Sequence, residues 1–180
     1  MRRLALAVVI TAGLLAAGCT THTVGVSGAA RPTAESPVLD AVANPCSLLD
    51  ARQRGQLGVG PGDVLDTTID GSAFCGWRSV VGNGDSFEAG IYPSRLRLDD
   101  VVATYPSPER MSVSGLDAVS TSARASVADR SCMIFAELPS GNLALASYFW
   151  EGLPEQASRE AACQLAKTAL EMVIASVIAR

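Results

Sequence analysis

Histidine is almost absent from this sequence, in which His22 is the only one among 180 residues. His22 lies in a stretch without hydrophobic periodicity, where we expect a linker residue with no functional role. A serine hydrolase of the usual type needs a histidine as its general base, and a cysteine nucleophile usually needs one too. Residues 45–180, which we expect to form the folded domain, contain no histidine. This absence argues against both classes of enzyme.

The short motifs that mark catalytic and metal sites are missing as well. The chain has no GxSxG nucleophile elbow, no HExxH zinc motif, no calcium-binding loop and no CxxC pair. The glycine-rich run GVGPGD (58–63) lacks the lysine of a phosphate-binding loop and includes a proline, so we interpret it as a turn. We therefore predict no catalytic residues, no metal ligands and no cofactor.

Acidic residues are the remaining candidates for acid–base chemistry. Asp99 and Asp100 are adjacent, but neighbours on a helix do not face each other, so we expect them to cap the helix or to contact solvent. Glu88, Asp117 and Glu137 are far apart in the sequence, which leaves open whether they converge in space. A hydrolase is therefore the least favoured interpretation.

The chain has few basic residues, with 14 lysines and arginines against 18 acidic residues and a formal net charge of −4. Two of the arginines, Arg2 and Arg3, belong to the N-terminal leader, and their removal with it would change the charge to −6. Affinity for nucleic acid depends on lysine and arginine neutralising phosphate. We therefore expect no nucleic-acid partner.

The leader combines Arg2 and Arg3 with an uncharged apolar run over residues 4–18. A helix of this length would span about 22 Å, which is short of the roughly 30 Å hydrocarbon core of a bilayer. A basic start, a short apolar centre and small residues before a cut are the parts of an export signal. Residues 16–19 (AAGC) resemble the lipobox of bacterial lipoproteins, in which the leader is cut before an acylated cysteine. We predict a lipoprotein signal peptide over residues 1–18 and lipid attachment at Cys19, with an ordinary secretory signal as the alternative.

The chain has five cysteines, and lipidation of Cys19 leaves the even set Cys46, Cys75, Cys132 and Cys163. An even set suits two disulfides in an oxidising compartment. Four cysteines allow three pairings, of which we favour Cys46–Cys75 and Cys132–Cys163 because they staple each half of the domain separately. Each closed loop of about 30 residues would contribute about 3–4 kcal/mol in the loop-entropy description.

Residues 19–44 are rich in Thr, Ala, Ser, Gly and Pro and show no sustained hydrophobic period. Such a segment cannot bury much surface, so we predict a flexible tether that spans roughly 25–30 Å. Residues 45–180 have the length of a single domain with its own core. Two or more acyl chains anchor a protein stably to a bilayer. These features predict a protein held by lipid to the extracytoplasmic face of the cell membrane.

The hydrophobic pattern of residues 45–180 predicts an α+β domain. Helices are expected over residues 44–57, 97–105 and 154–179, the last opened by Pro154. Apolar residues at helical spacing on the long C-terminal helix should pack across an antiparallel sheet, with Cys163 facing inward. Strands are expected over residues 74–81, 87–93, 110–116, 132–138 and 143–150, and PSGN (139–142) joins the last two in a hairpin.

Five short segments form an ordered set: NPCSLLD (44–50), CGW (75–77), VSGLDAV (113–119), CMIFAELPSGNLAL (132–145) and AACQLAKTALEMV (161–173). Together with the AAGC of residues 16–19, this set resembles an actinobacterial lipoprotein family with the domain of unknown function 3558. The family pairs a lipobox with an Asp/Asn-Pro-Cys-Ser-Leu-Leu start, a Cys-x-Trp strand and two later cysteines. The resemblance implies an exported, surface-anchored α+β module and implies no reaction.

Two binding functions from different classes follow. The domain is either a noncatalytic interaction module that contacts an envelope protein or glycan, or a carrier that encloses a lipid or glycolipid in an apolar cavity. Small residues on elements that should face each other would leave such a cavity or allow close packing, which we prefer: Ala144, Ala146, Ala162, Ala166 and Ala169. Trp77 and Trp150 could stack on sugars, but we expect Trp77 to pack near a disulfide and Trp150 to be partly buried.

Overall fold

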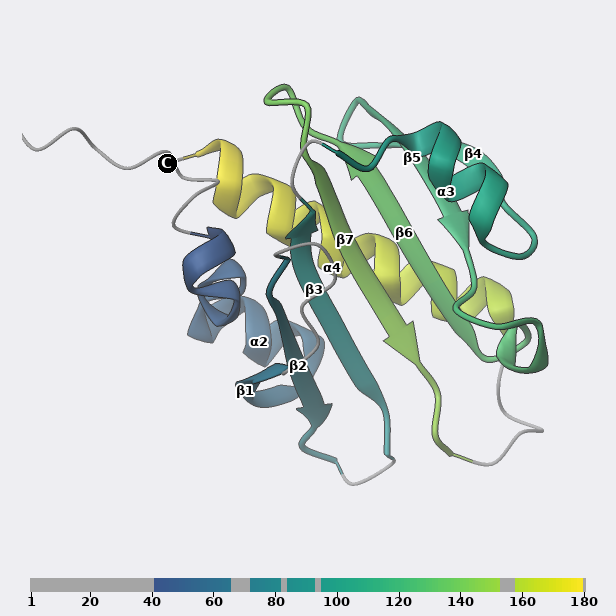
Figure 1. Ribbon diagram of the computed structural model, residues 1–180. Coiled ribbons are helices and arrows are strands. Elements are labelled where there is room, and N and C mark those ends of the chain that lie inside the picture. The colour runs from purple at the N-terminus through teal and green to yellow at the C-terminus, as the bar shows by residue number, and fades with distance from the viewer. Residues whose placement is uncertain (1–40, 66–71, 82–83, 93–94, 153–157, 180) are drawn as a thin grey trace, which may run out of the picture. The chain divides into compact units, whose positions relative to one another are not determined.

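The computed structural model describes residues 41–65, 72–81, 84–92, 95–152 and 158–179. All of them belong to one compact unit, residues 34–180. Its centre is a seven-stranded sheet in the order β1-β2-β3-β7-β6-β5-β4, and every neighbouring pair is antiparallel (Figure 1). The strands are β1 (Val59–Leu65), β2 (Phe74–Ser79), β3 (Ser86–Tyr92), β4 (Glu109–Val113), β5 (Leu116–Thr121), β6 (Ser131–Glu137) and β7 (Leu143–Phe149). This is the predicted α+β fold.

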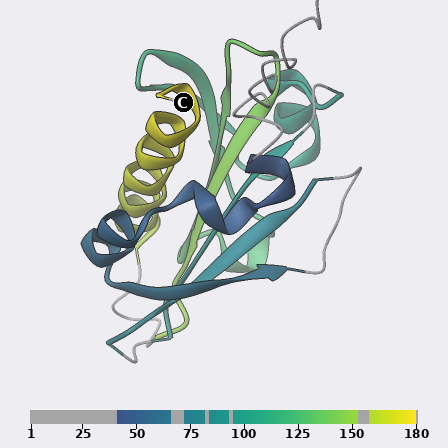
Figure 2. The same ribbon diagram turned by 90° about the vertical axis from the view of Figure 1, so that its left-hand side faces the viewer.

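The long C-terminal helix α4 (Arg159–Ile178) covers one face of the sheet and packs on β6 and β7 (Figure 2). The Ser158 hydroxyl caps it by accepting a hydrogen bond from the Ala161 amide at 3.1 Å, so the helix begins at Arg159 and not at the predicted Pro154, which lies outside the described residues. Its buried stripe consists of Ala162, Ala166, Ala169, Leu170, Val173, Ile174 and Val177. By length and composition α4 could span a bilayer, but that is weak evidence because the core helix of a soluble protein passes the same test.

The opposite face is partly covered by the short helix α3 (Leu98–Thr104), close to the predicted range 97–105. Leu98 and Val101 are buried there beside an aromatic cluster that includes Phe135. Asp100 accepts a hydrogen bond from the Arg97 amide at 2.9 Å, which caps the first turn as the sequence predicted. The core therefore lies on both faces of the sheet, but α3 contacts mainly β5 and β6.

The single helix predicted over residues 44–57 is wrong, because two shorter helices occupy this segment. They are the 3₁₀ helix η1 (Pro45–Leu48) and the α-helix α2 (Ala51–Leu57). Asp50 is extended and caps α2 by accepting a hydrogen bond from the Gln53 amide at 2.7 Å, which ends one helix and starts the next. Ala41, in a helical turn over residues 41–43, is only 2% exposed. Packed structure thus begins before residue 45, the predicted start of the domain.

The glycine-rich run at residues 58–63 is mostly strand rather than the predicted turn. Most of it belongs to β1, which is an edge strand of the described sheet and pairs with β2, with a bulge between Val59 and Gly62. An edge strand accepts Pro61 because its outer side makes no ladder hydrogen bonds. A side chain at Gly62 would clash with the sulfur of Cys75 and the indole of Trp77. Glycine is therefore required here for close packing, not for a turn.

The strand predicted over residues 110–116 is also wrong, because a tight hairpin interrupts it. Ser114 and Gly115 have φ of 52° and 79° and join β4 to β5. Two successive residues with positive φ make a turn whose twist matches that of paired strands. The other four predicted strands agree with β2, β3, β6 and β7 to within two residues at each end.

Candidate functional site

Two disulfides brace the domain in the pairing that the sequence favoured. Cys46–Cys75 joins η1 to β2, and Cys132–Cys163 joins β6 to α4. Trp77 packs beside the first disulfide and is 1% exposed, and Trp150 is half-buried against the same core. Cys19 and His22 lie outside the described residues.

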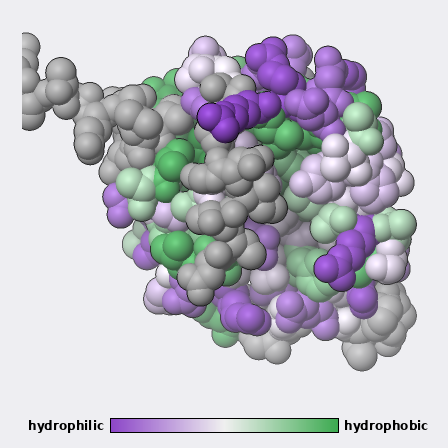
Figure 3. Space-filling model, viewed as in Figure 1, coloured by the Kyte–Doolittle hydropathy of each residue, from purple (hydrophilic) through white to green (hydrophobic). Residues whose placement is uncertain are grey.

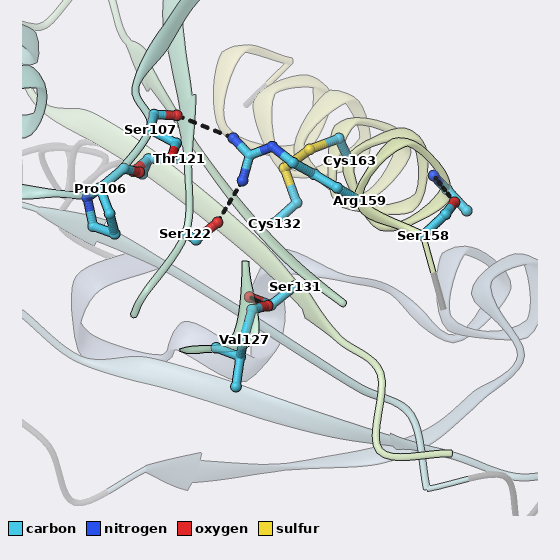
Figure 4. Close-up of a disulfide and its surroundings, with 11 residues drawn as sticks. Pro106, Ser107, Thr121, Ser122, Val127, Ser131, Cys132, Ser158, Arg159 and Cys163 are labelled. Carbon is cyan, nitrogen blue, oxygen red and sulfur yellow. Dashed lines mark hydrogen bonds between the residues drawn. A yellow bond between two sulfur atoms is a disulfide. The ribbon is translucent and has the colours of Figure 1, made fainter. Parts of the chain in front are cut away.

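Arg159 connects the start of α4 to the sheet beside the second disulfide (Figure 4). Its guanidinium donates one hydrogen bond to the buried hydroxyl of Ser122 and another to the Ser107 carbonyl at 3.1 Å. Thr121 fixes the same region by donating to the Pro106 carbonyl at 2.7 Å. Arg159 lies one helical turn before Cys163, so the two residues project from the same side of α4.

A groove of about 570 Å³ runs between this part of α4 and the strands β4 and β5, and we call it the helix-side groove. Charged side chains of both signs line it, together with the half-buried Met111: Glu109, Arg110, Arg159, Glu160 and Lys167. Arg110 forms an ion pair with Asp99 at 2.5 Å, and Lys167 lies 4.0 Å from Glu171. Beside the groove, β4 is an edge strand that pairs with β5, and among the residues that the structure describes its other edge has no sheet partner. Such a surface suits polar contacts to another polypeptide.

A second groove, of about 280 Å³, lies on the opposite face of the sheet, and we call it the Glu88 groove. Across its floor Glu88 of β3 is paired in register with Ser147 of β7, which is paired with Met133 of β6. Phe149 and Glu151 complete its border. Partial burial raises the pKa of the Glu88 carboxyl above its ordinary value, because desolvation disfavours the charged form.

The acidic residues that the sequence left open do not converge. Glu88, Ser147 and Met133 form one row across the sheet. Glu137 lies four residues beyond Met133 on β6, which places it about 13 Å from this row at the usual rise of a strand. Glu137 forms an ion pair with Arg97 at 3.3 Å, and Asp117 is an exposed residue of β5. Within the described ranges no three His, Cys, Asp or Glu side chains are placed to hold a metal ion.

The five small residues considered for a lipid cavity pack closely instead. Ala144 and Ala146 of β7 face α4, and Ala162, Ala166 and Ala169 of α4 face the sheet; none is more than 1% exposed. Small side chains allow a helix to lie close to a sheet, so these positions fill the interface between α4 and β7.

Sequence reasoning did not identify either groove. Arg159 could have been noticed as a charged residue one turn before a disulfide cysteine, but its partners Ser107 and Ser122 depend on the fold. The Glu88 groove depends on β3 pairing with β7, two strands that are more than 50 residues apart and carry no signal for pairing.

The fold and its hollows define a disulfide-braced α+β domain with an open groove on each face of the sheet. The chain matches the model of the family described as "Protein of unknown function (DUF3558)" over residues 14–176, and it belongs to that family. No curated protein matches the chain, and no solved structure does.

Proposed function

We propose that this protein is an exported lipoprotein, held by lipid on Cys19 to the extracytoplasmic face of the cell membrane. Its folded domain is a noncatalytic interaction module that binds a protein partner in the cell envelope. Support for the anchor comes from the leader and the sequence AAGC at residues 16–19. Support for an oxidising location comes from the two disulfides.

The observation that carries the binding function is the helix-side groove. It places charged residues of both signs beside the edge of β4 that has no sheet partner among the described residues. An extended segment of a partner can add to such an edge through its backbone, while its side chains contact Glu109, Met111 and Lys167. Exposed hydrophobic areas on the other face are small and separated by hydrophilic ones (Figure 3).

The alternative function, transport of a lipid or glycolipid, has less support. It needs an enclosed apolar cavity between α4 and the sheet, where Ala146 and Ala166 are fully buried in close packing. The adjoining helix-side groove is open to solvent and lined largely by charged groups. We therefore favour the interaction module over the carrier.

The proposal is tested by chemical crosslinking in native membranes, followed by mass spectrometry of the captured proteins. Gln164 is exposed and lines the groove, so Gln164→Trp should block it without disturbing the core. Gln56→Trp, at an exposed position of α2, is the matched control. We expect a specific partner that is captured by the wild type and the control but lost with Gln164→Trp. Equal capture by both variants would contradict a role for this groove.

A further inference from the structure

The Glu88 groove contains hydrogen-bond acceptors that the domain itself does not use. Ser147 is only 9% exposed and lines the groove, and its hydroxyl makes no hydrogen bond with any described residue. Glu88 and Glu151 form no ion pair in the described part of the chain. An accessible hydroxyl on this largely buried side chain, beside two carboxylates, offers oxygen acceptors to a group that donates hydrogen bonds.

Two arginines stand at the border of this groove. The guanidinium of Arg130 lies over the ring of Phe149, 5.8 Å from its centroid. Arg78 of β2 is exposed and is paired in register with Ser86, one row away from Glu88. The centre of the groove therefore presents the carboxylate of Glu88 with the hydroxyl of Ser147.

Apolar side chains line the Glu88 groove next to Glu88 and Ser147. Met133 adjoins Ser147 in the row of Glu88, and Phe149 follows on the same side of β7 two residues further along. A methylene chain can lie against these side chains while its charged end reaches the carboxylate, as lysine does on protein surfaces. The volume of about 280 Å³ suits one such chain rather than a folded partner.

We propose that the Glu88 groove binds a protonated amino group on a short aliphatic chain. The ammonium has three donors and no acceptor, which matches two carboxylate oxygens and one hydroxyl oxygen. Binding restores the stabilisation that the Glu88 carboxylate loses through partial burial. The shared chemistry fits a free alkylamine and a lysine side chain of a peptide.

The test is a titration of the full-length chain monitored by amide NMR shifts. The probes are n-pentylamine, 1-pentanol as its uncharged counterpart, and acetyl-Gly-Lys-Gly-amide with and without acetylation of the lysine. We expect both amines to bind and both uncharged probes to fail. A peptide that binds at least tenfold more tightly than pentylamine identifies a polypeptide lysine as the source, and the reverse order identifies a free amine.

Variants assign the binding to the groove. Glu88→Gln removes the charge at constant shape and should weaken amine binding at least tenfold, while Ser147→Ala should weaken it about threefold. Asp117→Asn, at an exposed position of β5 that lines neither groove, should leave the affinity unchanged. If Glu88→Gln fails to fold, the amine affinity of Ser147→Ala and the pH dependence of amine binding to the wild type test the proposal instead. The affinity of the wild type for the amines should fall on acidification, because Glu88 becomes protonated. The other charged groups near Glu88 are Arg78, Arg130 and Glu151. Undiminished binding by both variants, or no binding of either amine to the wild type, would overturn the proposal.

Discussion

Gln53 of α2 donates a hydrogen bond through Nε2 to the backbone carbonyl of Met172 on α4 at 3.3 Å, across 119 residues of sequence. The same side chain donates to the Ser176 hydroxyl at 3.2 Å, and its oxygen accepts from the Asp50 amide at 2.8 Å. One buried amide thus caps its own helix and fixes that helix to the C-terminal one.

Replacing Gln53 should therefore destabilise the domain. Gln53→Met keeps the volume but leaves the partners of the amide unsatisfied, and we expect a loss of about 1–3 kcal/mol in the free energy of unfolding. Gln56→Met, at an exposed position of the same helix, should change it by less than about 0.5 kcal/mol. Urea unfolding of both variants measures the difference, and equal stabilities would contradict this role.

Gly62 and Gly60 offer a second matched pair within β1. Gly62→Ala would push a methyl group into Cys75 and Trp77, which are fixed by a disulfide and by the core, and should cost about 1–3 kcal/mol. At Gly60 a methyl group would meet only ordinary contact, with Val80 at 3.5 Å. Thermal unfolding should therefore give a lower melting temperature for Gly62→Ala than for Gly60→Ala. Equal melting temperatures would show that β1 can shift to make room for the methyl group.

The disulfides should contribute separately to stability. Replacing Cys46 and Cys75 together, or Cys132 and Cys163 together, by alanine should each lower the free energy of unfolding by about 3–4 kcal/mol. Protein purified without reductant should have no alkylatable thiol among these four residues. Peptide mapping should recover the crosslinks 46–75 and 132–163, and a 46–132 crosslink would refute the pairing.

Glu88 should make stability depend on pH in a definite direction. Its pKa is raised above the ordinary value of 4.5 in the folded state, so the folded state binds this proton more tightly than the unfolded state. Stability therefore falls as pH rises from about 4.5 through the folded pKa, and the full cost is present above it. Glu88→Gln should stabilise the protein at pH 7 and lose this advantage below about pH 4. An advantage that is constant with pH would contradict this cause.

Cys19→Ser tests the anchor. The wild type should incorporate a fatty-acid analogue and fractionate with membranes, whereas the variant should be unlabelled and either uncut or released into the medium. Wild-type protein that is unlabelled and already soluble outside the cell would show that residues 16–19 are not a lipobox. This outcome is independent of both grooves.

The sequence predicted those elements whose burial is regular and missed those decided by contacts. The stripe on α4 and the start of β3, where Glu88 is exposed between buried Phe87 and Ala89, follow from apolar faces and were predictable. The burial of Gly90 and Tyr92 at the end of β3, on the other face, was not. β1 was missed because Pro61 and its glycines resemble a turn, and only the packing of Gly62 on Trp77 explains them as strand. The Glu88 groove was not predictable, because it requires knowing that β3 and β7 are neighbours at the centre of the sheet.

The placement of the two disulfides determines how the domain would carry a mechanical load. Tension applied at the N-terminal end passes from Cys46 directly to β2, and tension at the C-terminal end passes from Cys163 directly to β6. Everything inside the two covalent loops, including α2, β1 and β7, is shielded from extension. The segment between Cys75 and Cys132 lies outside both loops and can lengthen, as can the part of α4 beyond Cys163. A pull on a tethered domain would therefore spare β1 and β7, while the β4 wall of the helix-side groove has no disulfide to protect it.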